Sequence, residues 1–422
     1  MTTLRRLSLL ASLIVLSSGC GDGFGPNGPP QQITELPRDL SAAEAKLIDA
    51  DNEFGLKLLR QVRTAEGEGV NVFISPLSVA MALGMTYNGA AGSTESAMRG
   101  TLELGELTLE EINKSYRSAI DLLSGLDRSV RFTLANSIWY RQGLPVRQEF
   151  VDVNHEYFDA EVAALDFNAP DAARTINDWV KEKTERRIED IVADPIANDL
   201  VMFLINAIYF KGSWTARFDP ALTQPGPFTL TAGSHIDVLM MSTNDAIDVG
   251  YFGDGSVAVV DLPYGGQAYS MMIVLPAADN DLTEIIDGLD GETWRTWVEG
   301  LEANGIIITM PKFKLEYELT MNDVLKALGM GVAFDGDAAD FSGIADVSPE
   351  RLYISEVKHK TFVEVNEEGT EAAAATSVGI GVTSVDPTPP HIVIDRPFVF
   401  AIRERLSGTI LFLGAIERPE GG

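Results

Sequence analysis

The sequence has few of the residues that form disulfides, metal sites or catalytic centres. Its 422 residues include one cysteine, Cys20, and four histidines, His155, His235, His359 and His391. A single cysteine forms no disulfide within the chain, and none of the histidines has a zinc-binding spacing such as H-E-x-x-H. The sequence also lacks a G-x-S-x-G nucleophile elbow and a phosphate-binding Walker loop. It therefore offers no candidate for an enzyme active site, and we expect neither a metal nor a cofactor.

Basic residues are scarce relative to acidic ones. The chain has 32 Lys and Arg residues against 62 Asp and Glu residues, which gives a formal net charge of −30. Nucleic acids and anionic lipid surfaces would repel such a chain. Because no run rich in Lys or Arg offsets this charge locally, we expect no nucleic-acid partner.

The N-terminus lacks an apolar run long enough to span a membrane. Arg5 and Arg6 precede the apolar stretch Leu7–Leu16, which is typical of an export signal. Small residues then lead to Cys20, as in bacterial lipoprotein signals, although Ser17 stands where such signals usually have Leu. This resemblance implies a signal peptide over residues 1–20 and a lipid attached to Cys20. The alternative is a plain secretory signal.

Residues 21–39 are rich in Gly, Pro, Asn and Gln. Segments of this composition bury little apolar surface, so we expect a flexible tether. It would join the anchor at Cys20 to a folded body over residues 40–419. The expected location is the bacterial cell envelope, or the extracellular space if Cys20 carries no lipid.

The body has the composition of a globular protein, with 45% hydrophobic and 22% charged residues over the chain. Periodicity and capping residues predict helices early in the chain, while apolar or alternating runs predict strands that dominate its later part. This order favours an α+β fold. The predicted helices are Ala43–Arg63, Pro76–Tyr87, Asp171–Thr184 and Met321–Leu328, and the predicted strands are Leu200–Phe210, Ala268–Leu275, Ile306–Met310, Val357–Val365 and Val399–Ile402.

Several stretches of the body, taken in order, resemble the serpin family of serine protease inhibitors. The resemblance covers roughly residues 40–419. It implies one α+β domain with three β-sheets, a shell of helices and an exposed reactive-centre loop at about residues 367–394. The matching stretches are Asn71–Thr94, Leu204–Pro220, Pro311–Met330, Asp340–Ile344, Leu352–Thr376 and Asp395–Glu404.

In the hinge of the reactive-centre loop, the character of the side chains alternates from one residue to the next, as it does in a β-strand. Every second residue from Thr370 to Val382 is small or apolar, whereas the opposite face is polar, small or glycine. Burying its Val and Ile residues at ~1.5–3 kcal/mol each, with new ladder hydrogen bonds, would yield on the order of 10 kcal/mol. Loop insertion into a sheet, a known property of serpins, is therefore favourable for this loop. The hinge residues are Glu367, Gly369, Thr370, Glu371, Ala372, Ala373, Ala374, Ala375 and Thr376.

The family resemblance implies an inhibitor that traps a target endopeptidase as a covalent acyl-enzyme. The spacing that the family resemblance implies, counted from Glu367, places the scissile bond at Thr383-Ser384, with Val382 and Val385 as alternatives at the reactive position. From Thr370 to Asp395 there is no Lys or Arg. Trypsin-like proteases need a basic residue, so elastase-like or subtilisin-like serine proteases are the expected targets, with cysteine proteases also open.

Further positions match family sites by resemblance. Ser75, Ser78, Asn206 and His359 correspond to the polar "shutter" beneath the main sheet, and Trp214 corresponds to the "breach" where the loop enters. The region that binds heparin in some relatives, residues 101–131 here, is acidic in its first half, so heparin is not expected. We expect a monomer. The competing hypothesis is a non-inhibitory serpin that acts as a binding or structural module, but such relatives often have charged or bulky hinge residues.

Overall fold

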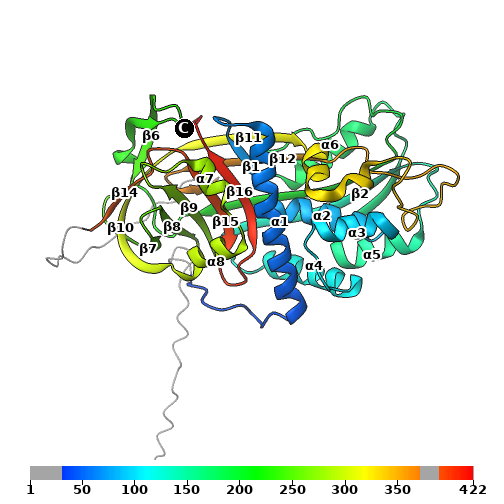
Figure 1. Ribbon diagram of the computed structural model, residues 1–422, viewed down its shortest axis with the longest axis horizontal. Helices are drawn as coiled ribbons and strands as arrows, with labels where there is room; N and C mark the ends of the chain where they lie inside the picture. Colours follow the sequence, from blue (N-terminus) through cyan, green and yellow to red (C-terminus); the bar gives the residue numbers. More distant parts are fainter. Residues whose placement is uncertain (1–30, 371–388, 422) are drawn as a thin grey trace, which may run out of the picture.

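Helices dominate the first half of the fold and strands the second half. The structure, a computed structural model, describes residues 31–370 and 389–421. The α-helices are α1 Ala42–Glu66, α2 Pro76–Tyr87, α3 Gly92–Thr101, α4 Leu109–Leu123, α5 Gln148–Phe158, α6 Ala172–Lys183, α7 Leu282–Asp287, α8 Gly291–Glu299 and α9 Asn322–Leu325. The 3-10 helices η1 Pro220–Leu222 and η3 Gly331–Phe334 and the π-helix η2 Lys326–Met330 are short. Figure 1 shows the strand-rich part of the molecule at one end and helices α2 to α5 at the other, with α1 between them.

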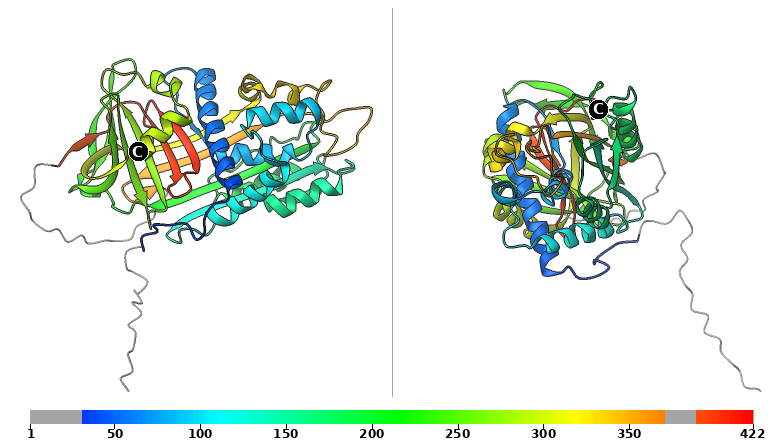
Figure 2. Two further views of the ribbon diagram at one scale, coloured as in Figure 1. Left: turned by 60° about the horizontal axis from the view of Figure 1, so that its bottom comes forward. Right: turned by 90° about the vertical axis from the view of Figure 1, so that its right-hand side faces the viewer.

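One sheet has six strands in the order β11-β12-β13-β4-β2-β3. Its long members run along the length of the molecule (Figure 2). β4 pairs with β2 over eleven positions, from Met202 to Gly212. The strands are β2 Val130–Arg141, β3 Glu161–Leu165, β4 Met202–Ser213, β11 Phe313–Thr320, β12 Lys358–Asn366 and β13 Gly369–Thr370.

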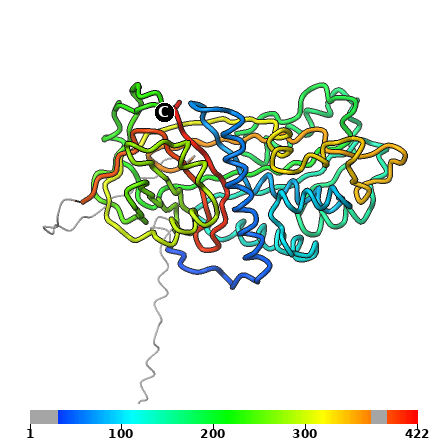
Figure 3. Tube along the Cα trace, viewed as in Figure 1, coloured from blue at the N-terminus to red at the C-terminus, as the bar shows by residue number. Residues whose placement is uncertain are grey.

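The other ten strands are joined to one another by pairing, and β10 connects two portions of this network. One portion of β10 pairs with β7 and the next portion pairs with β6, so two of the three sheets implied by the family resemblance share this strand. The strands are β1 Val72–Ile74, β5 Gln224–Thr229, β6 His235–Ser242, β7 Ile247–Gly253, β8 Val257–Tyr264, β9 Tyr269–Pro276, β10 Glu302–Pro311, β14 His391–Val393, β15 Phe398–Glu404 and β16 Ile410–Ile416. The first strand of the chain, β1, pairs with the last strand, β16, and β16 lies beside α1 (Figure 3).

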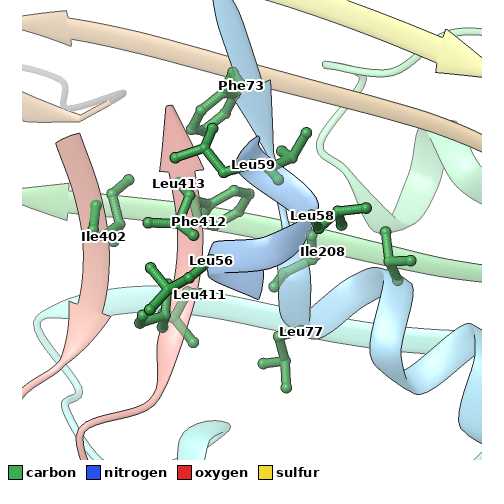
Figure 4. Packing of buried hydrophobic residues seen from close by; sticks show 14 of the residues in the cluster. Leu56, Leu58, Leu59, Phe73, Leu77, Ile208, Ile402, Leu411, Phe412 and Leu413 are labelled. Carbon is green, nitrogen blue, oxygen red and sulfur yellow. The ribbon is translucent and has the colours of Figure 1, made fainter. Parts of the chain in front are cut away.

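The core lies where α1 crosses the strands. Leu56, Leu58 and Leu59 of α1 are fully buried against side chains of β1 and β16, such as Phe73 and Leu413 (Figure 4). Burial of each such side chain is worth about 1.5–3 kcal/mol. These contacts join the N-terminal helix to the C-terminal strands and hold the α2 side of the six-stranded sheet in place.

Helix α2 begins where the sequence predicts. The Ser75 side chain accepts a hydrogen bond from the Ser78 amide, and Pro76 occupies the first turn. The helix predicted over Met321–Leu328 is also present, but it changes type along its length. The α-helix covers Asn322–Leu325, a π-helical turn follows over Lys326–Met330, and Gly329, at φ +114°, interrupts the helical conformation only after Leu328.

The flexible tether predicted for residues 21–39 does not extend over its C-terminal part. The Ile33 amide donates a hydrogen bond to the Gly266 carbonyl at 2.8 Å, and Arg38 forms an ion pair with Glu44 at 2.5 Å. Gly266 permits this contact, since a Cβ there would lie 2.7 Å from the Gln31 carbonyl oxygen. The composition of the segment therefore did not reveal that its C-terminal part contacts the folded body. Within residues 31–370 and 389–421, no helix is both long and apolar enough to cross a membrane.

Candidate functional site

The centre of the six-stranded sheet contains a very short strand between two long ones. β13 pairs with β12 through Thr370 and Val365, and with β4 through Thr370 and Gly212. Among the described residues, β4 and β12 have no direct backbone pairing with each other, so β13 alone bridges them. The sheet is therefore open along most of the length of these two strands.

A cleft that opens to solvent lies along this gap. One wall comes from β4 at Met202–Ala207, and the opposite wall comes from the chain at Leu352–Lys360, which leads into β12. Ser78 of α2 lines one side and Ile188, after α6, lines another. The unpaired edges of β4 and β12 thus face a space in which another strand could form hydrogen bonds.

Gly369 enters the gap in a conformation that other residues rarely adopt. Its φ is +150°, and a Cβ built on it would lie 2.0 Å from the Gly212 carbonyl oxygen and 2.7 Å from the Ser213 Cα. The neighbouring atoms are backbone of β4 and cannot rotate away. A glycine at this position is therefore necessary for the hinge to pair here.

Thr370 is almost fully buried beneath the end of the sheet, at 2% exposure. Its hydroxyl lies 2.6 Å from the Tyr264 hydroxyl. The Tyr264 ring stacks on Trp214 with the ring centroids 4.5 Å apart, and the Trp214 indole N–H donates to the Asn366 carbonyl at 2.9 Å. The Trp214 side chain thus lies against the chain just before β13.

Glu367 anchors the chain just before the hinge. Its carboxylate accepts a hydrogen bond from the Thr223 hydroxyl at 2.6 Å and pairs with the Lys312 ammonium at 3.0 Å. Burial raises the pKa of this carboxyl, but the hydrogen bonds from Thr223 and Lys312 outweigh burial and leave the pKa below its usual value. The charged carboxylate therefore fixes the point from which the loop departs.

The four predicted shutter residues lie together beneath β4 and β12. The Ser75 amide donates to His359 Nε2 at 3.0 Å, and the Ser75 hydroxyl donates to the Leu411 carbonyl at 2.7 Å. The Ser78 hydroxyl donates to the Asn206 carbonyl at 3.3 Å. Helix α2 thus holds one hydrogen bond to each of the two strands that flank the gap.

His359 and Asn206 differ in how well their polar atoms are satisfied. Burial lowers the pKa of His359 to about 4, so the ring is neutral and Nε2 can accept from Ser75. The Asn206 amide donates to Asn136 at 2.7 Å, but its carbonyl oxygen, Oδ1, is buried with no hydrogen-bond partner. The wall of the gap therefore contains an unused acceptor, which costs about 1–3 kcal/mol.

The chain that follows α6 reaches across the gap. α6 packs on β2 and β4, whereas the segment after it contacts β12. Asp190 accepts a hydrogen bond from Lys360 at 2.8 Å, and the Arg187 guanidinium lies 4.8 Å from the centroid of the Phe362 ring. These contacts must loosen if β4 and β12 are to move apart further.

Sequence reasoning named some of these residues and missed others. The structure brings together Ser75, Ser78, Asn206 and His359, and separately places Glu367, Gly369 and Thr370 beside Trp214. Tyr264 and Lys312 were missed, because their importance follows only from contacts with residues more than 50 positions away. Glu371–Thr376, Thr383, Ser384 and Cys20 lie outside the described residues, and the roles of all these sites remain predictions.

Comparison with known proteins identifies the class to which this fold and open sheet belong. The family model described as "Serpin (serine protease inhibitor)" matches residues 49–419. The chain is a member of the serpin family, in agreement with the resemblance found in the sequence.

Two relatives and one solved structure illustrate the likeness. Human neuroserpin is 34% identical over 365 residues, covering 84% of this chain and 88% of the relative. The human leukocyte elastase inhibitor is 34% identical over 383 residues, covering 89% of this chain and all of the relative. Tengpin, a thermophilic serpin solved in its native state, superposes with a TM-score of 0.80 at 30% identity, covering 92% of this chain and 97% of tengpin. In the parts of the chain that the structure describes, no group of three or more His, Cys, Asp or Glu residues could hold a metal ion.

Proposed function

We propose that this serpin inhibits serine endopeptidases by trapping them as the cleaved loop inserts between β4 and β12. The observation that supports this most directly is β13, where the hinge is paired with both strands above an open cleft. A strand that continues from Thr370 would find two unpaired edges, one on β4 and one on β12.

The register of β13 predicts where each hinge residue would lie. If the pairing continues residue by residue from Thr370, the side chains of alternate loop residues would point to the same buried face as Thr370. Small residues suit these positions, because large buried side chains stand on both sides. Ala372 would lie between Phe210 and Val363, Ala374 between Ile208 and Thr361, and Thr376 between Asn206 and His359.

This register also assigns a partner to the unused acceptor in the gap. The Thr376 hydroxyl would come beside Asn206, whose Oδ1 is buried without a hydrogen bond. A new hydrogen bond there would add about 0.5–1.5 kcal/mol to the insertion energy. With burial of Val378, Ile380 and Val382, the total remains on the order of 10 kcal/mol, which is comparable to the stability of a whole domain.

The covalent step uses the nucleophile of the protease. Its serine hydroxyl would attack the carbonyl carbon of Thr383, the peptide bond to Ser384 would break, and the amine of Ser384 would leave with a proton. The ester to Thr383 would persist because insertion carries the protease ~45 Å, the length of a strand from Gly369 to Thr383. This serpin supplies no catalytic residue in this scheme.

The target class follows from the residues around this bond. Elastase-like or subtilisin-like serine proteases accept small and β-branched residues such as Thr383 and Val382, whereas trypsin-like proteases do not. Cysteine proteases remain a further class. We also propose that the protein is exported, acts as a monomer, and is held at the bacterial cell envelope by a lipid on Cys20.

The test is incubation with a panel of elastase-like, subtilisin-like and trypsin-like proteases, followed by a denaturing gel and mass spectrometry. A stable one-to-one complex with the first two classes, and cleavage after Thr383, is the expected result. Clean cleavage of the loop with no complex across the panel would instead favour a non-inhibitory serpin that acts as a binding or structural module.

A further inference from the structure

The cleft between β4 and β12 is lined from both faces of the sheet as well as by the two strands. Helix α2 lines it on one face with Ala82 and Leu83, and the segment after α6 lines it on the other face with Ile188. Successive residues of β4 confirm that these elements lie on opposite faces, because Ala207 packs in the cluster of α6 and Ile208 in the cluster of α2. The cleft is therefore enclosed on several sides, as ligand sites are.

The cleft has room for a small organic molecule. Its internal volume is about 120 Å3. An apolar cavity of about 150 Å3 accommodates benzene, so a molecule of about five or six carbon atoms is of suitable size. Toward the end remote from β13 the wall is apolar, with Met202 and Leu204 on one side and Leu352 and Ile354 on the other. This part of the cleft suits a short hydrocarbon chain.

The charged residues that the structure places in the wall already have partners of opposite charge. Lys358 pairs with Glu356 at 3.8 Å. Lys360 pairs with Asp190 at 2.8 Å and with Glu318 at 3.3 Å. An ionised occupant would lose its hydration without gaining a free counter-charge, which is costly. The cleft therefore favours an uncharged molecule.

The shutter residues that line the cleft are uncharged and leave one acceptor unused. Ser78 and the neutral ring of His359 both take part in hydrogen bonds. Asn206 donates through Nδ2 to Asn136 at 2.7 Å, but its buried Oδ1 has no partner among the described residues. A molecule that satisfies this acceptor needs an O–H or N–H group.

We propose that the cleft binds a short-chain aliphatic alcohol while the loop lies outside the sheet. The alcohol hydroxyl donates to Asn206 Oδ1, the acceptor that the proposed register assigns to the Thr376 hydroxyl, and the hydrocarbon chain packs on the apolar side chains of the wall. Because the alcohol and the loop need the same space, an occupied cleft slows loop insertion. This effect on inhibition rests on the proposed function, whereas the binding itself does not.

Titration of the full chain with n-pentanol, followed by NMR, tests the site. We expect saturable one-to-one binding, and binding of the isomer butyl methyl ether, which has no O–H donor, about two- to tenfold weaker. Ala82→Leu should weaken pentanol binding about tenfold or more, because its side chain takes the space in which the pentyl chain buries its surface. Ala45→Leu, on the exposed face of α1, should bind as the parent does. Thermal unfolding checks that both variants are folded.

The protein with a cleaved and inserted loop provides a second comparison. Insertion is recognised by a rise in the unfolding temperature after a protease has cut the loop. Such a protein should no longer bind pentanol, because the inserted strand fills the cleft, and retained binding would place the site elsewhere. In the uncleaved protein, saturating pentanol should lower the yield of covalent complex with a protease that is otherwise trapped, and an unchanged yield would refute the competition.

The binding results also decide the proposal on their own. Equal affinity of Ala82→Leu and the parent, or equal weakening in both variants, would exclude the cleft. Equal affinity for the ether and the alcohol would exclude the hydrogen bond to Asn206. Absence of saturable binding by the parent would mean that the cleft holds water only. If pentanol binds but no protease is trapped, the proposed inhibition fails and the site remains, whereas trapping without pentanol binding gives the opposite conclusion.

Discussion

Replacing Thr370 by arginine tests whether pairing of the hinge is the first step of inhibition. The Thr370 side chain is 2% exposed and lies against the Tyr264 hydroxyl at 2.6 Å. Arginine there would lose this hydrogen bond, worth about 0.5–1.5 kcal/mol, and would bury an unpaired charge at a cost of several kcal/mol. The overall insertion energy, on the order of 10 kcal/mol, would remain favourable.

The effect should therefore be on the rate of insertion. An added barrier of about 3 kcal/mol slows the first step by roughly 100-fold, which gives the protease time to hydrolyse the acyl-enzyme. We expect Thr370→Arg to be cleaved as a substrate, with little covalent complex on a denaturing gel. Thr370→Ser keeps the hydroxyl and should form complex as the parent does. If Thr370→Arg traps protease as efficiently as the parent, the side chain of residue 370 does not enter the buried face.

Three further predictions concern the same region. Gly369→Ala should release the hinge from β4, and hydrogen exchange should show this as faster exchange of the amides at the end of β4. Gly255→Ala, at φ +90° with no atom within 4 Å, should leave this exchange unchanged. Unaltered exchange in Gly369→Ala would contradict the predicted clash between its Cβ and the backbone of β4. Lys312→Met should lower stability at pH 7 by about 1–3 kcal/mol, because it leaves Glu367 without its cation. Since the pKa of Glu367 is lowered in the folded state, this difference should disappear as pH falls through that pKa, and a difference that persists in acid would argue against the pair. The pKa of His359 falls from 6.5 to about 4 on folding, so acidification over this range should cost about 3 kcal/mol of stability. His359→Gln should reduce that loss, as measured by thermal unfolding at a series of pH values. An identical pH profile for the variant and the parent would refute the assignment.

Local features of the fold could be predicted from the sequence where local chemistry decides them. Ser75 and Pro76 define the start of α2, and the apolar run from Leu200 becomes β4, beginning at Met202. The helix expected over Met321–Leu328 forms as α-helix Asn322–Leu325 and then as a π-helical turn that reaches Met330. Periodicity and capping residues thus located these elements, but they did not reveal the change from α-helix to π-helix after Leu325.

The arrangement of the candidate site depends on contacts that periodicity does not encode. β4 and β12 are about 150 residues apart in the chain, and nothing in either strand indicates that the other is its neighbour across a gap. Trp214 was named only by family resemblance, and Tyr264, which stacks on it, was not named at all. Similarly, nothing in the sequence singles out Asp51, which is buried and accepts a hydrogen bond from Tyr116 of α4.

The short strand β13 determines which face of the loop can be buried before any protease arrives. A slip of one residue would exchange the two faces of a strand. In the observed register Thr370 points inward, and a slip would place Glu371 at the buried position instead. Gly369 prevents such a slip, because the position opposite Ser213 accepts only a residue without a Cβ. If the loop inserts as proposed, the pairing of two residues at the hinge would bury the small and apolar face of the residues that follow, and the register would need no later correction.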